Sequence, residues 1–107
     1  MTFDAYDRSL SLLRTLAPLL VRLDAIDPRL ADQMRRAAQS TTLNIAEGNR
    51  RRGKDRRNRF TCSLGSADEV AAALDVATAL GYLEPDAVAP ALELVDRVRA
   101  MTYRLSH

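Results

Sequence analysis

The sequence predicts an all-α protein folded as an antiparallel up-down-up-down four-helix bundle. Apolar residues recur at spacings of three and four in four segments, which is the period of one face of an α-helix. No segment alternates apolar and polar residues as a half-buried strand does, and no hairpin turn signal occurs. The connections between the four segments are short, so consecutive helices should run antiparallel. The length of 107 residues fits one domain over residues 1–107.

The first two helices follow from apolar faces and one clear start signal. The first face includes Leu10, Leu13 and Leu20. Asp27-Pro28 then marks the start of the second helix, because a carboxylate caps the helix and proline suits its first position. The second apolar face comprises Leu30, Met34, Ala37, Ala38, Thr41 and Ile45. Gly48 is typical of the left-handed residue that ends a helix, so we expect a loop over residues 48–54.

Two further apolar faces predict the third and fourth helices. The third face comprises Phe60, Leu64, Ala67, Ala71, Leu74 and Thr78, and Gly81 should end that helix. Pro85 and Pro90 bracket the start of the fourth helix, whose face comprises Ala91, Leu94, Val98, Met101 and Leu105. The apolar arcs of the first and fourth helices are wider than the single stripe that a monomeric bundle needs. Either the bundle is deeply packed, or the extra leucines contact another subunit, and we favour the second interpretation.

The residue inventory excludes several classes of site. A single cysteine, Cys62, excludes an internal disulfide framework and a four-cysteine zinc site. A single histidine, the terminal His107, removes nearly all histidine-based catalysis and metal ligation. We therefore expect no enzymatic activity, no cofactor and no metal. No apolar run reaches a membrane span and no signal-peptide pattern opens the chain, so the predicted location is cytoplasmic and off the membrane.

Charge is distributed unevenly along the chain. Ten basic and three acidic residues lie between Arg29 and Arg59, a net charge of +7. The remainder carries six basic and eleven acidic residues, a net charge of −5, and the total of +2 conceals this asymmetry. In an up-down-up-down bundle the second connection lies at one end and the first and third at the other. One end should therefore be basic and the other acidic.

The basic end contains the candidate nucleic-acid-binding residues. They are Arg50, Arg51, Arg52, Lys54, Arg56, Arg57 and Arg59. Cations in the first turn of a helix oppose its macrodipole at a cost of about 0.3–1 kcal/mol each, so local stability does not explain them. Arginine predominates, and its guanidinium fork matches phosphate oxygens. Two alternatives stay open: a solvated loop, and a patch that meets acids on another protein chain.

A second set of polar residues shares the facing sides of the second and third helices. We interpret it as a structural polar network of Arg36, Ser40, Asn44, Glu47, Ser66 and Glu69. The expected register places Ser66 near Arg36, and Arg36 should pair with Glu69 or Asp68. Asn44 and Glu47 should hydrogen-bond the backbone of the second connection. Acid–base catalysis by the carboxylates stays an alternative, although no nucleophile accompanies them.

Several short runs resemble a known family. These are Arg-Arg-Ala-Ala-Gln-Ser at 35–40, Asn-Ile-Ala-Glu-Gly at 44–48, Leu-Gly-Ser at 64–66 with Glu69, and Leu-Gly-Tyr-Leu at 80–83. In order and approximate spacing they resemble the four-helix bundle proteins encoded in intervening sequences of bacterial large-subunit ribosomal RNA genes. The resemblance covers about residues 30–83. It implies a four-helix bundle that assembles into ring-like pentamers, and it does not imply an enzyme.

The functional expectation combines the basic end with this resemblance. We expect a homo-oligomeric, pentameric helical scaffold that binds nucleic acid, RNA in preference to DNA, through the basic end. A related group of small basic bundles serves as accessory proteins of diversity-generating retroelements, and its members bind a reverse transcriptase and nucleic acid. The alternative is therefore a protein-interaction module, such as a partner of a reverse transcriptase, whose basic end docks on an acidic protein surface.

Overall fold

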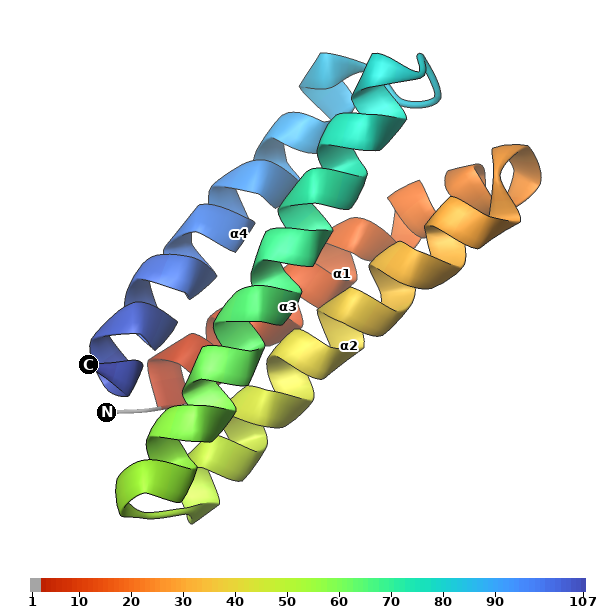
Figure 1. Ribbon diagram of the computed structural model, residues 1–107. Helices are drawn as coiled ribbons and strands as arrows, with labels where there is room; N and C mark the ends of the chain where they lie inside the picture. Colours follow the sequence, from red (N-terminus) through yellow and green to blue (C-terminus); the bar gives the residue numbers. More distant parts are fainter. Residues whose placement is uncertain (1–2) are drawn as a thin grey trace.

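Four long helices make up the computed structural model, which describes residues 3–107 (Figure 1). They are α1 (Phe3–Ile26), α2 (Pro28–Arg50), α3 (Gly53–Ala79) and α4 (Pro85–Ser106). The described residues contain no strand. The predicted all-α four-helix bundle is therefore confirmed.

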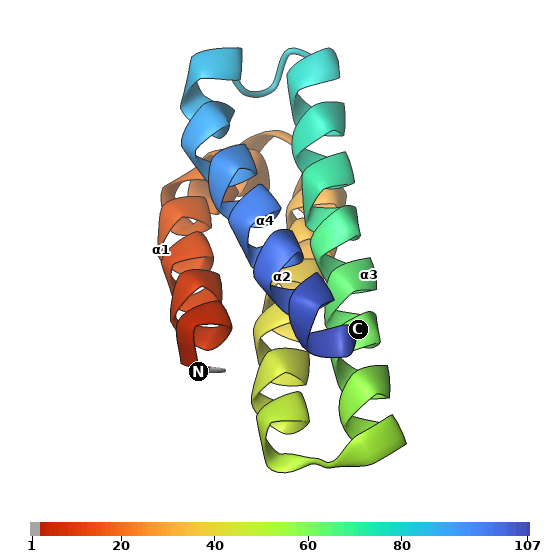
Figure 2. The same ribbon diagram turned by 90° about the vertical axis from the view of Figure 1, so that its left-hand side faces the viewer.

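The helices pack as a closed square around one core. α1 and α3 each pack against both α2 and α4, so α1 and α3 lie diagonally across the bundle. The α1–α2 and α3–α4 connections lie together at one end, which we call the connection end (residues 24–28 and 80–86). The α2–α3 connection lies at the other end. Both views show it projecting beyond the start of α1 and the end of α4 (Figures 1 and 2).

Local turn chemistry fixes the connection end as predicted. The Asp27 side chain accepts a hydrogen bond from the Leu30 backbone N–H at 3.1 Å, and Pro28 occupies the first position of α2. Gly81 adopts a positive φ of 77° after the end of α3. The Tyr82 N–H donates to the Ala77 carbonyl at 2.9 Å, which completes a Schellman cap.

The expected loop over residues 48–54 is wrong. α2 continues to Arg50 and α3 begins at Gly53, so only two residues connect them. Gly48 is a buried helical residue, and a Cβ atom there would lie 2.6 Å from Cε1 of Phe60. The glycine is needed for this close approach rather than for a turn. Gly53, with φ of 58°, supplies the left-handed residue instead.

The core divides into two clusters along the bundle. The larger one fills the connection-end half and includes Leu16, Leu23, Met34 and Leu74. The smaller one supports the other half and comprises Ala5, Ile45, Phe60 and Val98. Within residues 3–107, no helix combines the length and the apolar character that crossing a membrane requires.

Candidate nucleic-acid interface

The predicted basic end is a narrow tip formed by the close of α2 and the opening of α3. We call residues 50–59 the basic tip; it holds seven basic side chains and one acid, Asp55. It is the part of the α2–α3 hairpin that projects past α1 and α4 (Figure 2). Arg56 and Arg59 are half-buried, and the other five basic residues are exposed. The connection end carries four acidic residues: Asp24, Asp27, Glu84 and Asp86. The two ends of the bundle therefore carry opposite charge, as expected.

Arg51 is held by two carboxylates of its own chain. Its Nη2 lies 3.1 Å from Oε2 of Glu47 and its Nη1 lies 3.1 Å from Oδ2 of Asp55. The hydrogen bond to Glu47, followed by the charge of Asp55, raises the pKa of Arg51 above its ordinary value. This clamp spans the α2–α3 connection. Arg51 therefore fastens the tip, and the expectation that Glu47 bonds the backbone of the connection is wrong.

Arg56 is also engaged within the tip. Its Nη1 donates to the carbonyl of Gly48 at 3.1 Å, and its guanidinium carbon lies 4.8 Å from the centre of the Phe60 ring. The carbonyl of Gly48 is one of the last in α2 and also accepts the Arg51 backbone N–H at 3.2 Å, so Arg56 adds a second bond that helps to cap that helix. The contact with the ring adds a cation–π interaction. Arg56 thus has a structural role that its sequence position did not reveal.

The other five basic residues of the tip face no carboxylate. Across residues 3–107, their side chains make neither an ion pair nor a hydrogen bond. We call them the open cations: Arg50, Arg52, Lys54, Arg57 and Arg59. They lie at the end of α2, in the connection and in the first two turns of α3, whose N-cap residue, Arg52, provides no capping side chain within the described chain. Exposed arginines beside uncapped helical N–H groups form a surface suited to anions.

The predicted polar network is only partly assembled. The hydroxyls of Ser40 and Ser66 lie 2.8 Å apart, and Nδ2 of Asn44 donates to the Ser40 carbonyl at 2.9 Å. Asn44 therefore bonds its own helix rather than the backbone of the connection. Ser66 faces Ser40 instead of Arg36, one helical turn away from the expected register.

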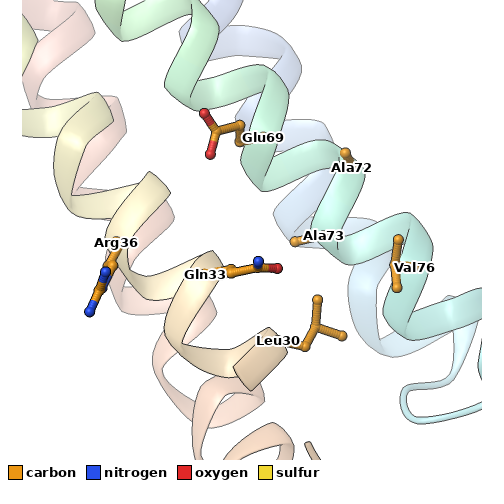
Figure 3. Close-up of a pocket in the computed structure, with 7 residues that line it drawn as sticks. All are labelled: Leu30, Gln33, Arg36, Glu69, Ala72, Ala73 and Val76. Atoms are coloured by element: carbon orange, nitrogen blue, oxygen red, sulfur yellow. The ribbon is translucent and has the colours of Figure 1, made fainter. Parts of the chain in front are cut away.

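The expected pairing of Arg36 with Glu69 or Asp68 is wrong. Nε of Arg36 lies 3.1 Å from Oδ2 of Asp32 on the same helix, while Asp68 pairs with Arg99 of α4 at 3.0 Å. Figure 3 shows the Arg36 guanidinium turned away from Glu69. Asp32 lies four residues before Arg36 on the same helix, so Arg36 reaches it without bridging two helices and pairs with it in preference to Glu69.

Two shallow grooves follow one another along the seam between α2 and α3. The apolar groove, about 400 Å³, lies toward the connection end (Figure 3) and is lined by Leu30, Gln33, Arg36, Glu69, Ala72, Ala73 and Val76. The polar groove, about 350 Å³, lies next to the basic tip and is lined by Arg36, Gln39, Ser40, Leu43, Asn44, Glu47 and Arg59. Arg36 borders both grooves, and Arg59 belongs to both the polar groove and the tip.

Two residues of the polar groove escaped the sequence analysis. Leu43 and Gln39 lie outside the apolar face of α2 and outside the set of charged residues, so neither pattern selects them. The sequence signal that could have identified Leu43 is a large apolar residue directly next to the buried face of its helix.

Cys62 is exposed. Among residues 3–107, no three histidine, cysteine or carboxylate side chains cluster closely enough to hold a metal ion.

Comparisons with known proteins agree with this architecture. The family model described as 23S rRNA-intervening sequence protein matches residues 2–104. A crystal structure of a protein of unknown function from the S23 ribosomal protein family of Bacteroides thetaiotaomicron VPI-5482 superposes with a TM-score of 0.87. It is 17% identical, with 95% of this chain and 97% of that chain covered, and at this identity it shows the fold alone. No curated protein matches the sequence.

Proposed function

The chain belongs to the 23S rRNA-intervening sequence protein family, and from that premise we propose a non-enzymatic, homo-oligomeric scaffold that binds RNA through its basic tip. The observation that carries the proposal is the set of open cations on a projecting hairpin. Five cations without carboxylate partners are available to phosphate oxygens, whereas Arg51 and Arg56 hold the tip together. Contacts of this kind position a nucleic acid without reading its bases.

The shape of the tip supports binding to a folded RNA. A duplex presents closely spaced phosphates along its grooves, and a narrow projecting hairpin reaches them without steric interference from the rest of the bundle (Figure 2). Arg50 ends α2 and Arg52 lies in the connection, and the open cations at 54, 57 and 59 follow on α3. We propose that these residues contact the backbone, and that Arg51 and Arg56 support them.

Exposed apolar side chains support assembly of several copies. Val21 on α1 is 70% exposed and Leu80, which directly follows α3, is 57% exposed; Ile26 at the end of α1 and Val76 on α3 are exposed as well. α1 and α3 lie diagonally across the bundle, so a contact that joins α1 of one copy to α3 of the next is heterologous. Heterologous contacts that close produce a ring, and a ring of five matches the family resemblance.

The same residues leave the basic tip free in such a ring. Val21, Ile26, Val76 and Leu80 all lie in the half of the bundle nearest the connection end. Contacts between subunits there would align the projecting tips of neighbouring copies at one side. We propose that the ring multiplies a modest affinity per tip into tight binding of one RNA.

A salt titration of a charge-matched pair of variants tests RNA binding. The tip variant changes Arg50, Arg52, Lys54 and Arg57 to Gln; the control changes the exposed Arg8, Arg14, Arg97 and Arg104 to Gln. Both lose four positive charges. With four phosphate contacts per chain, the slope of log affinity against log salt should be about −3 for a single strand and about −4 for a duplex. The tip variant should lose that slope and the control should keep it; equal losses would contradict binding by the tip.

An acidic protein partner is the second candidate function. The observation that favours it is Arg51, which already binds two carboxylates inside the tip. A reverse transcriptase or another protein with an acidic patch would then occupy the open cations. In that case the tip variant loses capture of the purified partner, while RNA affinity is weak and unchanged by salt in the wild type.

A further inference from the structure

The polar groove is a direct extension of the basic tip along the seam of α2 and α3. Arg59 is an open cation of the tip and also lines one end of the groove. Arg36 lines the other end. An RNA backbone held at the tip would therefore pass the mouth of the groove, with a guanidinium at each end of it.

The two arginines retain unused hydrogen-bond donors. Arg59 is half-buried, and across residues 3–107 its side chain has neither an ion pair nor a hydrogen-bond partner. Withdrawing a guanidinium partly from water without a partner is unfavourable, and an anion in the groove would remove that cost. Arg36 is 79% exposed and pairs with Asp32 through Nε, so its two terminal nitrogens remain for a phosphate.

The acid in the groove does not cancel this preference for anions. Glu47 lines the groove, but its carboxylate pairs with Arg51 at 3.1 Å. The paired carboxylate adds little net negative charge where a phosphate would lie. The remaining lining contains no other acid among the described residues. Among residues 3–107, Arg59 is therefore a cation without an acidic partner at one end of the groove. Arg36 at the other end shares its charge with Asp32, and the middle of the groove is close to neutral.

The middle of the groove offers what a nucleobase recognises. Leu43 is 64% exposed on its wall and provides an apolar surface for the flat face of a base. Asn44 uses Nδ2 on the Ser40 carbonyl and hydroxyl, which leaves its Oδ1 without a partner among residues 3–107 and open as an acceptor. Gln39 is exposed and adds both a donor and an acceptor.

The size of the groove limits the occupant. A volume of about 350 Å³ lies at the lower end of the range for small-ligand sites, which suits one nucleotide and not a helix. Bases inside an A-form duplex cannot enter such a groove, because stacking and pairing hold them in the helix. Bases in loops, bulges and ends can be splayed out and bound by their faces and edges.

We propose that the polar groove binds one unpaired nucleotide of the RNA, so that the protein prefers RNA with unpaired bases to a continuous duplex. The inference rests on the proposed binding of RNA by the basic tip and adds selectivity to it. Arg59 and Arg36 contact the flanking phosphates. Leu43 packs against the face of the base, and the side chains of Gln39 and Asn44 form hydrogen bonds with its edge.

Two RNAs of equal phosphate number provide the test. One is a blunt hairpin, and the other carries a bulge of two nucleotides in the same stem. The groove variant, Gln39→Ala with Leu43→Ser, removes the amide and the apolar wall without changing charge. Its matched control, Gln33→Ala with Tyr103→Ser, changes an exposed amide and an exposed apolar side chain outside the polar groove. Affinities come from fluorescence anisotropy at fixed salt.

The wild type and the control should bind the bulged RNA at least about fivefold more tightly than the blunt one, as expected for one well-bonded base. The groove variant should bind both RNAs equally, at the affinity of the wild type for the blunt hairpin. No preference in the wild type, or a preference that survives in the groove variant, would overturn the inference. In either case the tip variant tests backbone binding separately, because its affinity for the blunt hairpin still reports on the tip alone.

A variant that should bind RNA more tightly checks that the groove variant does not lose affinity merely because its structure is disturbed. Leu43→Tyr replaces the wall with an aromatic ring, on which an unpaired base stacks more strongly. This variant should tighten binding of the bulged RNA and leave the blunt hairpin unchanged. Equal tightening of both RNAs, or none, would count against a base in the groove. The melting curve and the light-scattering mass of each variant should match those of the wild type, since the altered side chains are exposed.

Discussion

The two ends of the bundle are closed by different physical means. At the connection end, the Asp27 side chain caps α2 and Gly81 carries the chain out of α3 through a Schellman cap. At the basic tip, no side chain caps the start of α3 at Arg52 within residues 3–107. There the Arg56 side chain reaches back to the Gly48 carbonyl and lies over the buried Phe60 ring.

The difference shows where each end draws its stability. The connection end uses caps formed by residues a few positions apart, and Arg35 of α2 adds an ion pair with Asp24 of α1 at 2.8 Å. The tip carries cations where the dipole of α3 disfavours them, and it depends on the packing of Gly48 and Phe60 across two helices. The packing of these two residues stabilises the tip. The open cations of the tip are therefore not needed to hold its structure.

The largest expected effect is on the support of the tip. Phe60→Ala should lower the free energy of unfolding by about 3–5 kcal/mol, because it empties the smaller core cluster. The same change removes the ring on which Arg56 rests. Urea denaturation followed by circular dichroism measures it. A loss below about 1 kcal/mol would mean that the tip does not depend on this ring.

Gly48→Ala tests the close approach of the two helices at the tip. Alanine gains up to about 1 kcal/mol in helix propensity, but overpacking a tight core costs about 1–3 kcal/mol. We expect a net loss, since the new Cβ would lie 2.6 Å from the Phe60 ring. In a double-mutant cycle, Phe60→Leu should reduce the cost of Gly48→Ala. Additive effects would refute the steric explanation.

Asp27→Ala probes the connection end. Loss of the cap on the Leu30 N–H should cost about 1 kcal/mol of the free energy of unfolding. Asp27→Asn keeps an acceptor oxygen and should restore most of it, which separates capping from charge. RNA affinity should be unchanged by either substitution. A change in RNA affinity larger than that of the tip variant would indicate that the RNA binds at the connection end and not at the basic tip.

Arg52→Asp gives α3 at the tip the same kind of aspartate cap that Asp27 gives α2 at the connection end. The backbone of Arg52, with φ of −132° and ψ of 157°, already suits a capping residue. The substitution should raise the free energy of unfolding by about 0.5–1 kcal/mol, since it adds a cap and removes a cation from the N-terminus of α3. RNA affinity should fall at the same time. Arg52→Gln, which removes the charge without adding a cap, separates the two effects.

The predictability of each end follows from the range of the interactions that form it. Asp27-Pro28 and Gly81 were identified from the sequence, because caps and positive-φ turns involve residues a few positions apart. The prediction that Gly48 ends α2 is wrong, because glycine serves both helix ends and close helix contacts, and only the position of Phe60 distinguishes the two. The charge asymmetry was evident, whereas the engagement of Arg51 and Arg56 was not.

The sequence by itself determined the four helices, their antiparallel order and the opposite charges of the two ends. These follow from periodicity, connection length and local composition, which are independent of how the helices rotate against one another. The tertiary structure alone decided which cations are open, that Arg36 pairs with Asp32, and that Leu43 and Gln39 face the polar groove. The reason is geometric: a register shift of one turn moves a side chain by about 5.4 Å along its helix, beyond the reach of a hydrogen bond.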